Sequence, residues 1–263
     1  MKKFLVIGNP IKHSLSPQLH NFWIKKNNIN AVYEKKQLNS ENLQDIILMI
    51  KERKIDGLNV TVPFKREIIS YLDELSVHAS KTQSVNTIYL EDKKIIGHNT
   101  DIYGFELAIK NNNYDVKGKK VLILGAGGVV PSIIFALTKM EAKNIMITNR
   151  TKSKAESLKK LFVDLSIIEW GKLPEFDMII NATSLGLKKN EAINIELLNT
   201  CKNKFFYDVI YNPRETKFLK DAKNNGNKIE NGGKMFIYQA AEAFKIWHGF
   251  QPEISDEINR LLD

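Results

Sequence analysis

The sequence predicts an α/β protein built from two lobes. Short apolar strands alternate with amphipathic helical segments along most of the chain, a pattern typical of sheets covered by helices. The chain has 263 residues, enough for one large domain or two of ordinary size, and 43% of them are hydrophobic, as in globular proteins. Near residues 101–105 the polar loops of the first part give way to continuous apolar strands. We therefore expect one lobe on each side of this point.

The first lobe is predicted to begin with a strand at residues 3–9, "KFLVIGN". Ser16, with Pro17 after it, has the residue types of a helix N-cap and first helical position, which predicts a helix to about Lys26. Ser40 is the predicted N-cap of the next helix. Further strands are expected at 31–38, 55–62, 87–91 and 94–99, the last two as a hairpin.

The second lobe is predicted to open with the strand of "GKKVLILGAGG", residues 118–128, and a helix to about Met140. Buried strands are expected within 144–151, 177–183 and 205–211, each with a helical segment nearby. A last pair of helices follows from about Gly233, broken near Pro252, and is expected to return to the first lobe. The predicted domains are therefore residues 1–102 with 235–263, and residues 103–234.

The glycine loop after the first strand of the second lobe indicates a dinucleotide site. Gly125 would make the tight turn, and Gly127 would let the backbone approach a pyrophosphate held by N–H groups of the following helix. Val130 stands at the third glycine position, and Pro131 falls in the first helical turn, where a missing N–H costs little. This arrangement predicts a Rossmann-like, doubly wound lobe.

The end of the next strand bears on the choice of cofactor. NAD-selective enzymes place an acidic residue there to bind the ribose 2′-hydroxyl. Here Asn149, Arg150 and Thr151 occupy the position, and the first acid is Glu156. An arginine pairs with a 2′-phosphate, whereas a carboxylate would repel it. We expect NADP rather than NAD; the alternative is a surface arginine at a helix start.

Polar side chains gather at strand ends and loops of the first lobe. Ser14 and Ser16 stand just before a predicted helix, and their hydroxyls with helix-start amides would suit a carboxylate; the alternative is that both only cap the helix. The stretch "NVTVPFK" ends a buried strand on Lys65, which with Asp101 forms a potential acid–base pair. A mere surface ion pair is the alternative. Thr61 and Asn86 would bind hydroxyl groups.

The composition excludes several classes of protein. The net charge of +9 comes from scattered lysines without a basic block, so we expect no nucleic-acid partner. The chain has no run of about 18 apolar residues, so no membrane span is predicted. The single Cys201 excludes an internal disulfide, which fits a reducing cytoplasm. The histidines His13, His20 and His98 do not have the spacing of a metal site.

The order of these motifs resembles that of shikimate dehydrogenases over nearly the whole chain. The shared motifs are "GNPIKHSLSPQLHN", "NVTVPFK", "SVNT", "GHNTD", "GAGG", "NRT", "NATSLG" and "DVIYNP". The resemblance implies reversible, NADP-dependent hydride transfer between shikimate and 3-dehydroshikimate, in aromatic amino-acid biosynthesis. Val129, Val130 and the Gly233–Lys234 pair depart from the residues usual in the family, which bears on cofactor affinity and domain closure more than on the reaction.

The resemblance also implies roles for individual residues. Lys65 would be the catalytic lysine and Asp101 its partner, with Ser14 and Ser16 on the substrate carboxylate. The other implied substrate residues are Thr61, Asn86, Tyr211 and Gln239. The implied cofactor residues are Gly125, Ala126, Gly127, Gly128, Asn149, Arg150, Thr151, Thr183 and Gly232. No metal is expected, and the chain would work as a monomer or homodimer.

Two rival functions stay open at this point. The first is a related dehydrogenase that uses quinate, or a folate-type methylene dehydrogenase of similar two-lobed shape. Quinate users often favour NAD through an acid after the second strand, which this chain lacks, and the Ser14–Ser16 pair argues against a folate ligand. The second is a catalytically silent NADP-binding regulator, which should have lost the proton-handling pair.

Overall fold

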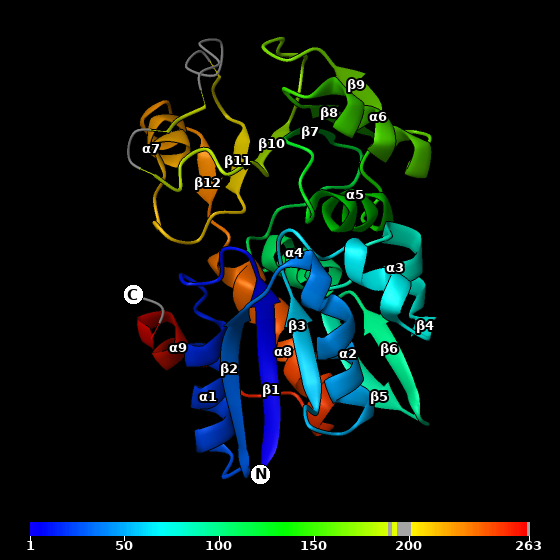
Figure 1. Cartoon of the computed structure of the whole chain (residues 1–263). Helices are drawn as coiled ribbons and strands as arrows, with labels where there is room; N and C mark the ends of the chain where they lie inside the picture. Colours follow the sequence, from blue (N-terminus) through cyan, green and yellow to red (C-terminus); the bar gives the residue numbers. More distant parts are fainter. Residues whose placement is uncertain (189–190, 194–200, 262–263) are drawn as a thin grey trace. The chain divides into compact units, whose positions relative to one another are not determined.

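The computed structural model describes residues 1–188, 191–193 and 201–261, and the chain divides into two compact units (Figure 1). Unit 1 comprises Met1–Gly104 and Ile237–Asp263, and unit 2 comprises Phe105–Phe236. Each unit has its own six-stranded sheet. Among the described residues, no helix is both long and apolar enough to cross a membrane.

Unit 1 is built on a mixed sheet with the strand order β2-β1-β3-β5-β6-β4. Strand β1 pairs in parallel with β2 and β3, while β5 runs antiparallel to β3 and β6. The strands are β1 (Lys2–Gly8), β2 (Ala31–Gln37), β3 (Gly57–Val60), β4 (Glu74–Leu75), β5 (Thr87–Glu91) and β6 (Lys94–His98). The helices are α1 (Ser16–Lys26), α2 (Leu43–Lys51), α3 (Val77–Thr82) and α9 (Asp256–Leu261), with short 3-10 turns η1 (Ser40–Asn42) and η2 (Glu67–Tyr71). The predicted hairpin of β5 and β6 is confirmed.

The core of unit 1 follows from the apolar period of α2. Leu43, Ile46, Ile47 and Ile50 recur at helical spacing, and all four are buried. They pack in one cluster with strand residues such as Leu58. Beyond the sheet, α4 (Asp101–Lys110) and α8 (Gly233–His248) each run across the sequence boundary between the units.

Two predicted helix caps are wrong. Ser16 is the first residue of α1, whose N-cap is Leu15 and has no side-chain cap hydrogen bond. Ser40 lies inside η1 and donates to Glu67 Oε2 at 3.0 Å. In the second case a tertiary partner outcompetes the local backbone for the serine hydroxyl, an effect that residue type alone does not reveal.

Unit 2 is built on a fully parallel sheet with the order β12-β11-β10-β7-β8-β9. Its strands are β7 (Lys120–Leu124), β8 (Asn144–Thr148), β9 (Ser166–Ile168), β10 (Met178–Asn181), β11 (Phe205–Asp208) and β12 (Lys228–Glu230). Its helices are α5 (Val130–Lys139), α6 (Lys152–Leu161) and α7 (Lys217–Asn224). The strand order reverses between β7 and β10, which is the doubly wound arrangement, and the predicted fold class is confirmed.

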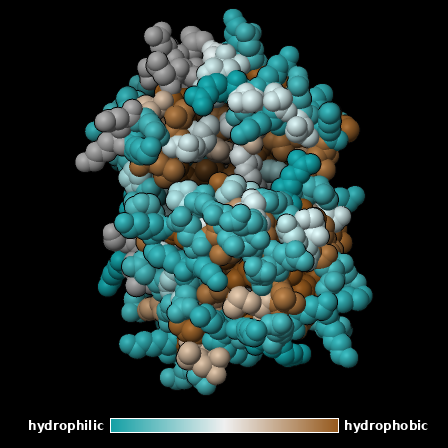
Figure 2. Space-filling view, in the orientation of Figure 1, coloured by the Kyte–Doolittle hydropathy of each residue, from teal (hydrophilic) through white to brown (hydrophobic). Residues whose placement is uncertain are grey.

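The central strands of this sheet are apolar because both of their faces are covered. Every residue of β10 and β11 is buried, as the continuous apolar runs in the sequence predict. The cluster that contains Leu122, Ile179 and Phe206 also takes in Phe218 and Leu219 from α7. The surface is different in character, and Figure 2 shows hydrophilic side chains over much of the visible face.

An aromatic cluster joins the first and last segments of unit 1. Phe4 of β1 stacks on Trp247 of α8 at a centroid distance of 4.9 Å, and Trp23 of α1 meets Phe244 edge-on at 5.6 Å. His20 lies within this cluster, stacked on Tyr33 at 4.1 Å with an interplanar angle of 3°. Burial lowers the pKa of His20 to about 3, with a further contribution from His248.

We expect His20→Phe to reduce the loss of stability in acid. The unfolded chain binds a proton at this residue below pH 6.5 and the native state does not, so the unfolding free energy falls as pH drops from 6.5 toward 3. Between pH 6.5 and 5 the wild-type protein is expected to lose about 2 kcal/mol of unfolding free energy through His20, and the variant would not lose it. The unfolding free energy is measured with urea at pH 7.5 and at pH 5. The difference between the two values does not contain any packing cost of the substitution that is independent of pH. The exposed His13→Phe is the control, and an unchanged slope in the His20 variant would contradict the expectation.

Candidate active site

The site in unit 1 is centred on a buried ion pair. Lys65 Nζ donates to Asp101 Oδ2 at 2.5 Å, and the two side chains are 10% and 7% exposed. Among the ion pairs of described residues, it is the one in which both partners are almost covered. Asp101 is the first residue of α4, where the helix dipole favours a carboxylate. The alternative of a surface pair is therefore wrong.

Asn86 holds the carboxylate of this pair in place. Its Nδ2 donates to Asp101 Oδ1 at 2.9 Å and to Gln239 Oε1 at 3.3 Å. Its Oδ1 accepts the backbone N–H of Thr100 at 2.8 Å, which fixes the amide orientation because an N–H can only donate. The structure thus brings together four of the predicted residues, Lys65, Asp101, Asn86 and Gln239.

A buried polar chain behind Asn86 was not predicted. Tyr33 donates to Asn59 Oδ1 at 2.7 Å, and Asn59 Nδ2 donates to Asn86 O at 2.9 Å and Thr87 Oγ1 at 3.1 Å. Thr87 Oγ1 in turn donates to Asn86 Oδ1 at 3.0 Å. An asparagine in the middle of the apolar strand "GLNV" was the available signal, because a buried amide requires partners.

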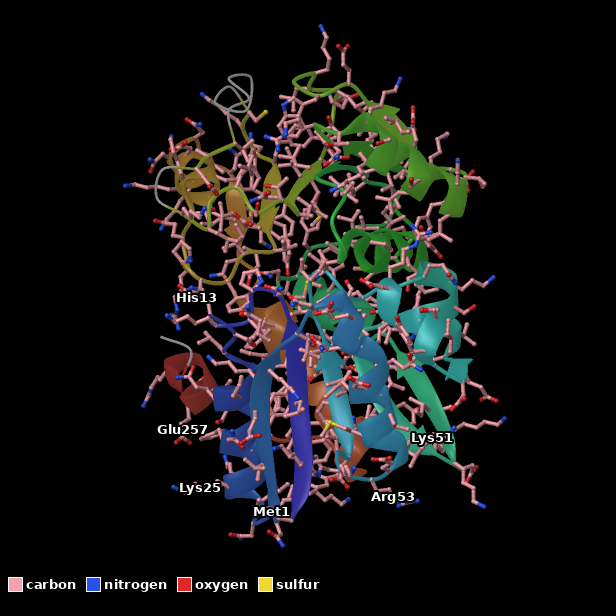
Figure 3. The ribbon with its side chains drawn as sticks, viewed as in Figure 1. Met1, His13, Lys25, Lys51, Arg53 and Glu257 are labelled. Atoms are coloured by element: carbon pink, nitrogen blue, oxygen red, sulfur yellow. The ribbon has the colours of Figure 1, made fainter. Side chains whose placement is uncertain are left out.

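Ser14 lies in the loop before α1, Ser16 is the first residue of α1, and Thr61 directly follows β3. The N–H of Ser16 points to Ser14 Oγ at 3.4 Å, and Ser16 itself is buried. Thr61 follows β3, and a Cβ added at Gly8 would lie 2.6 Å from its methyl group, so the ends of β1 and β3 are closely packed. His13, beside Ser14, lies at the opposite end of unit 1 from Met1 and Arg53 (Figure 3). Among the described residues, no hydrogen bond joins Thr61 to Ser14 or Ser16.

The glycine loop of unit 2 fits an anionic diphosphate. Gly125 adopts φ +105°, and an added Cβ would lie 2.8 Å from Ala182 O, so only glycine is accommodated. Within the described part of the chain, no group accepts from the N–H of Ala126 or Gly127, and both Gly127 and Gly128 are exposed. These donors precede α5, which begins at Val130 with Pro131 in its first turn, as predicted.

The end of β8 adds a cationic group to this part of the sheet. Arg150 is exposed and forms no ion pair with a described residue, and Thr151 is the N-cap of α6. Asn149 Nδ2 donates to Thr151 O at 2.7 Å, which holds the turn together. Since β8 neighbours β7, the donor set of these three residues and the glycine loop fits a dinucleotide that carries a 2′-phosphate.

The other predicted residues of unit 2 lie on its remaining strand ends. Thr183 follows β10, and both its N–H and its hydroxyl donate to Asn181 Oδ1, at 3.0 and 2.7 Å. Tyr211 stacks on Phe236 at 4.5 Å, and its role at the substrate stays a prediction. A Cβ at Gly232 would lie 2.1 Å from Val209 O.

We expect Gly232→Ala to destabilise the protein and weaken cofactor binding. The new methyl would overlap a backbone atom that cannot rotate away, and such overpacking costs about 1–3 kcal/mol. The unfolding free energy and the KM for NADP measure the two effects. Gly233→Ala is the matched control, because its Cβ would meet only the Asn231 side chain, at 3.0 Å. Equal changes in the unfolding free energy and in the KM for NADP in the two variants would contradict the expectation.

Of the histidines considered as metal ligands, His13 is exposed, whereas His20 and His98 have aromatic ring neighbours. His20 belongs to the aromatic cluster, and His98 lies 5.9 Å from His78. Burial, with a contribution from His78, lowers the pKa of His98 to about 4. No group of three potential metal ligands occurs among the described residues.

Comparison with known proteins gives consistent matches along the chain. Family models match at residues 6–88 (shikimate dehydrogenase substrate binding domain), 106–227 (shikimate / quinate 5-dehydrogenase) and 234–256 (shikimate 5′-dehydrogenase C-terminal domain). A curated shikimate dehydrogenase (NADP(+)) of Pelagibacter ubique is 59% identical over 262 residues, covering 100% of this chain and 99% of that protein. One of Caldicellulosiruptor bescii is 41% identical and covers 94% of this chain and 89% of that protein.

Solved structures agree with these sequence matches. The shikimate dehydrogenase of Aquifex aeolicus has a TM-score of 0.90 at 39% identity and covers 100% of this chain and 97% of its own. A shikimate dehydrogenase solved in complex with NADP+ has a TM-score of 0.92 at 38% identity, with coverages of 100% and 94%. That of Thermus thermophilus, in complex with NADP(H) and shikimate, has a TM-score of 0.89 at 31% identity, with coverages of 100% and 98%.

Proposed function

The chain belongs to the shikimate dehydrogenase family, and from that premise we propose how its own residues perform the reaction. It is an oxidoreductase that uses NADP and interconverts shikimate and 3-dehydroshikimate in the pathway to chorismate and aromatic amino acids. The observation that carries the assignment of roles is the buried Lys65–Asp101 pair, held by Asn86. A silent NADP-binding regulator would have no need to keep that pair.

The substrate is held by unit 1 in this proposal. Ser14 and Ser16 bind its carboxylate, and Thr61, Asn86 and Gln239 bind ring hydroxyls or neighbouring atoms. Ser16 is buried and stands first in α1, so its side chain lies at the helix N-terminus. Tyr211 contributes to the same substrate. We propose residues 1–102 with 235–263 as the substrate-binding domain.

The cofactor is held by residues 103–234, proposed as the NADP-binding domain. Gly125, Ala126, Gly127 and Gly128 receive the pyrophosphate, since the N–H groups of Ala126 and Gly127 have no acceptor among the described residues. Asn149, Arg150 and Thr151 bind the 2′-phosphate, and Arg150 supplies the charge. Thr183 and Gly232 line the same site.

The protein's task in the chemical step is to move a proton. When bound, NADP+ accepts the hydride that leaves the carbinol carbon. In the direction of oxidation the O–H bond of the hydroxyl on that carbon breaks, its electron pair forms the C=O bond, and the proton goes to the neutral Lys65 amine. In the direction of reduction the Lys65 ammonium, paired with Asp101, returns the proton to the forming hydroxyl oxygen. Asn86 binds one oxygen of Asp101 and Lys65 binds the other. The fixed carboxylate therefore restricts the rotation of the Lys65 side chain and orients its amine. A positioned acid–base group of this kind contributes roughly 10²–10⁴-fold.

The test is absorbance at the nicotinamide band on mixing the protein with shikimate and NADP. We expect rapid reduction with this pair, slower reduction with NAD, and little with quinate in place of shikimate. Turnover with quinate at a comparable rate would support a broader shikimate/quinate enzyme, the second candidate that the matched family description names. No turnover with any pair would overturn the proposal in favour of a non-catalytic NADP-binding protein.

We also propose a cytoplasmic location and a monomeric or homodimeric state for the protein. Light scattering of the purified chain distinguishes the two states, and a larger assembly would contradict both.

A further inference from the structure

Asp208 is a fully buried carboxylate at the end of β11 that the reaction does not use directly. Its Oδ1 accepts from Asn181 Nδ2 and from the N–H of Ile210, both at 3.0 Å. Its Oδ2 accepts from Thr216 Oγ1 at 2.6 Å. One side chain therefore joins three segments of unit 2: the end of β10, the loop after β11 and the start of α7.

The first of these segments leads to the loop at residues 182–186. Because an ionised carboxylate can only accept, the Asn181 amide turns its Nδ2 to Asp208 and its Oδ1 to Thr183. That Oδ1 accepts the N–H and hydroxyl of Thr183, and Thr183 Oγ1 accepts the N–H of Leu185 at 3.1 Å. Asp208 thus sets the conformation of this loop through Asn181.

The loop at 182–186 lies directly against the glycine loop. A Cβ at Gly125 would be 2.8 Å from both Ala182 O and Thr183 Cγ2, and one at Gly127 would be 3.7 Å from Ala182 O. The two loops follow β10 and β7, the neighbouring strands where the sheet order reverses. A shift of the first loop would therefore change the space over the N–H groups of Ala126 and Gly127.

The other two bonds of Asp208 reach the loop at 209–216. Thr216 is the N-cap of α7, where its side chain accepts from Leu219 N at 3.4 Å. The Ile210 bond fixes the first turn of the loop next to Val209, whose carbonyl is packed against Gly232. Thr183 and Gly232 are both proposed cofactor residues, so the hydrogen-bond network of one carboxylate extends to both sides of that site.

We propose that Asp208 is a positioning residue for NADP, acting through Asn181 and the 182–186 loop and through the 209–216 loop. The inference rests on the proposed function, since it concerns the cofactor site of that reaction. A carboxylate suits the position because three donors converge on it and both oxygens only accept. Burial raises the pKa of Asp208 to about 6, so the group is mostly ionised at pH 7.

The substitutions that separate positioning from folding are Asp208→Ala, Asp208→Asn and Thr216→Val. Alanine removes all three bonds. Asparagine retains an acceptor for Asn181 and Ile210, while its amide can donate to Thr216. We expect Asp208→Ala to raise the Kd for NADPH about tenfold, as the loss of one well-formed hydrogen bond at the ligand would. We expect Asp208→Asn to stay within about threefold and Thr216→Val to lie between the two.

Three measurements are made on the full chain: NADPH fluorescence titration, KM for shikimate at saturating NADP, and hydrogen exchange of the 182–186 amides without cofactor. We expect a raised Kd, an unchanged KM for shikimate and faster exchange. Asp221→Ala is the control, because the substitution also removes one negative charge. Asp221 lies on α7, where it forms an exposed ion pair with Lys217.

The inference is overturned if Asp208→Ala lowers the melting temperature while the Kd for NADPH and the loop exchange stay unchanged. Equal increases in the Kd for NADPH and the KM for shikimate would also overturn it. If Asp208→Ala does not fold, Thr216→Val decides, and an unchanged Kd in that variant is contrary to the proposal. A wild-type protein without turnover of shikimate and NADP would instead contradict the proposed function.

Discussion

Lys65→Ala is expected to lower kcat by about 10²–10⁴-fold while the KM for shikimate changes little. The amine is the proton-handling group of the proposal, and its pairing with Asp101 at 2.5 Å shows it fixed rather than mobile. The carboxylate and hydroxyl contacts to the substrate come from other residues, so binding should survive. Steady-state kinetics with shikimate and NADP measure both constants.

The substitution also leaves Asp101 buried without its partner, which costs about 3–5 kcal/mol of stability when a buried pair is broken. The double variant Lys65→Ala with Asp101→Asn removes the unpaired charge and should recover stability without recovering kcat. Lys94→Ala is the control, because Lys94 pairs with Glu74 at the surface of the same unit. A Lys65 variant that is folded and has wild-type kcat would exclude Lys65 from the proton step.

Arg150→Ala is expected to raise the KM for NADP about 10- to 100-fold and the KM for NAD by less than about threefold. A hydrogen bond to a charged group contributes about 1.5–3 kcal/mol, and 1.4 kcal/mol corresponds to tenfold. NAD lacks the 2′-phosphate, so it has no such bond to lose. Because Arg150 is exposed, the difference should shrink at high ionic strength.

Lys160→Ala is the matched control for Arg150, since it removes one exposed positive charge from the last turn of α6. It should change both KM values equally and only slightly. Equal effects of Arg150→Ala on NADP and NAD would show that Arg150 does not read the 2′-phosphate, and the selectivity would then have to come from Asn149 and Thr151.

Periodicity and turn chemistry were sufficient to predict the main elements. The continuous apolar runs of β7, β10 and β11 mark buried parallel strands, and the glycine loop marks the strand where the sheet order reverses. Strands of two or three residues, such as β4 and β12, have no detectable period and were not predicted. Their pairing depends on neighbours that come from elsewhere in the chain.

The site was predictable to the extent that its residues stand at strand ends. Lys65 and Asp101 could be paired in advance, but their burial could not, because it depends on Asn86 and on the start of α4. The support by Tyr33, Asn59 and Thr87 was not predicted, since the bonds from Tyr33 to Asn59 and from Asn59 to Thr87 join segments far apart in sequence.

The discontinuous unit 1 has a consequence for biosynthesis on the ribosome. Its strand β1 is made first, yet Phe4 stacks on Trp247, and a Cβ at Gly57 would lie 2.4 Å from the Trp247 indole nitrogen, so α8 covers these strands closely. Domains usually fold in order from the N-terminus during synthesis. Here unit 2 comes from one continuous segment, so it can complete its sheet before unit 1 does. The apolar surface of β1 and β3 that α8 covers therefore stays exposed until α8 has been synthesised.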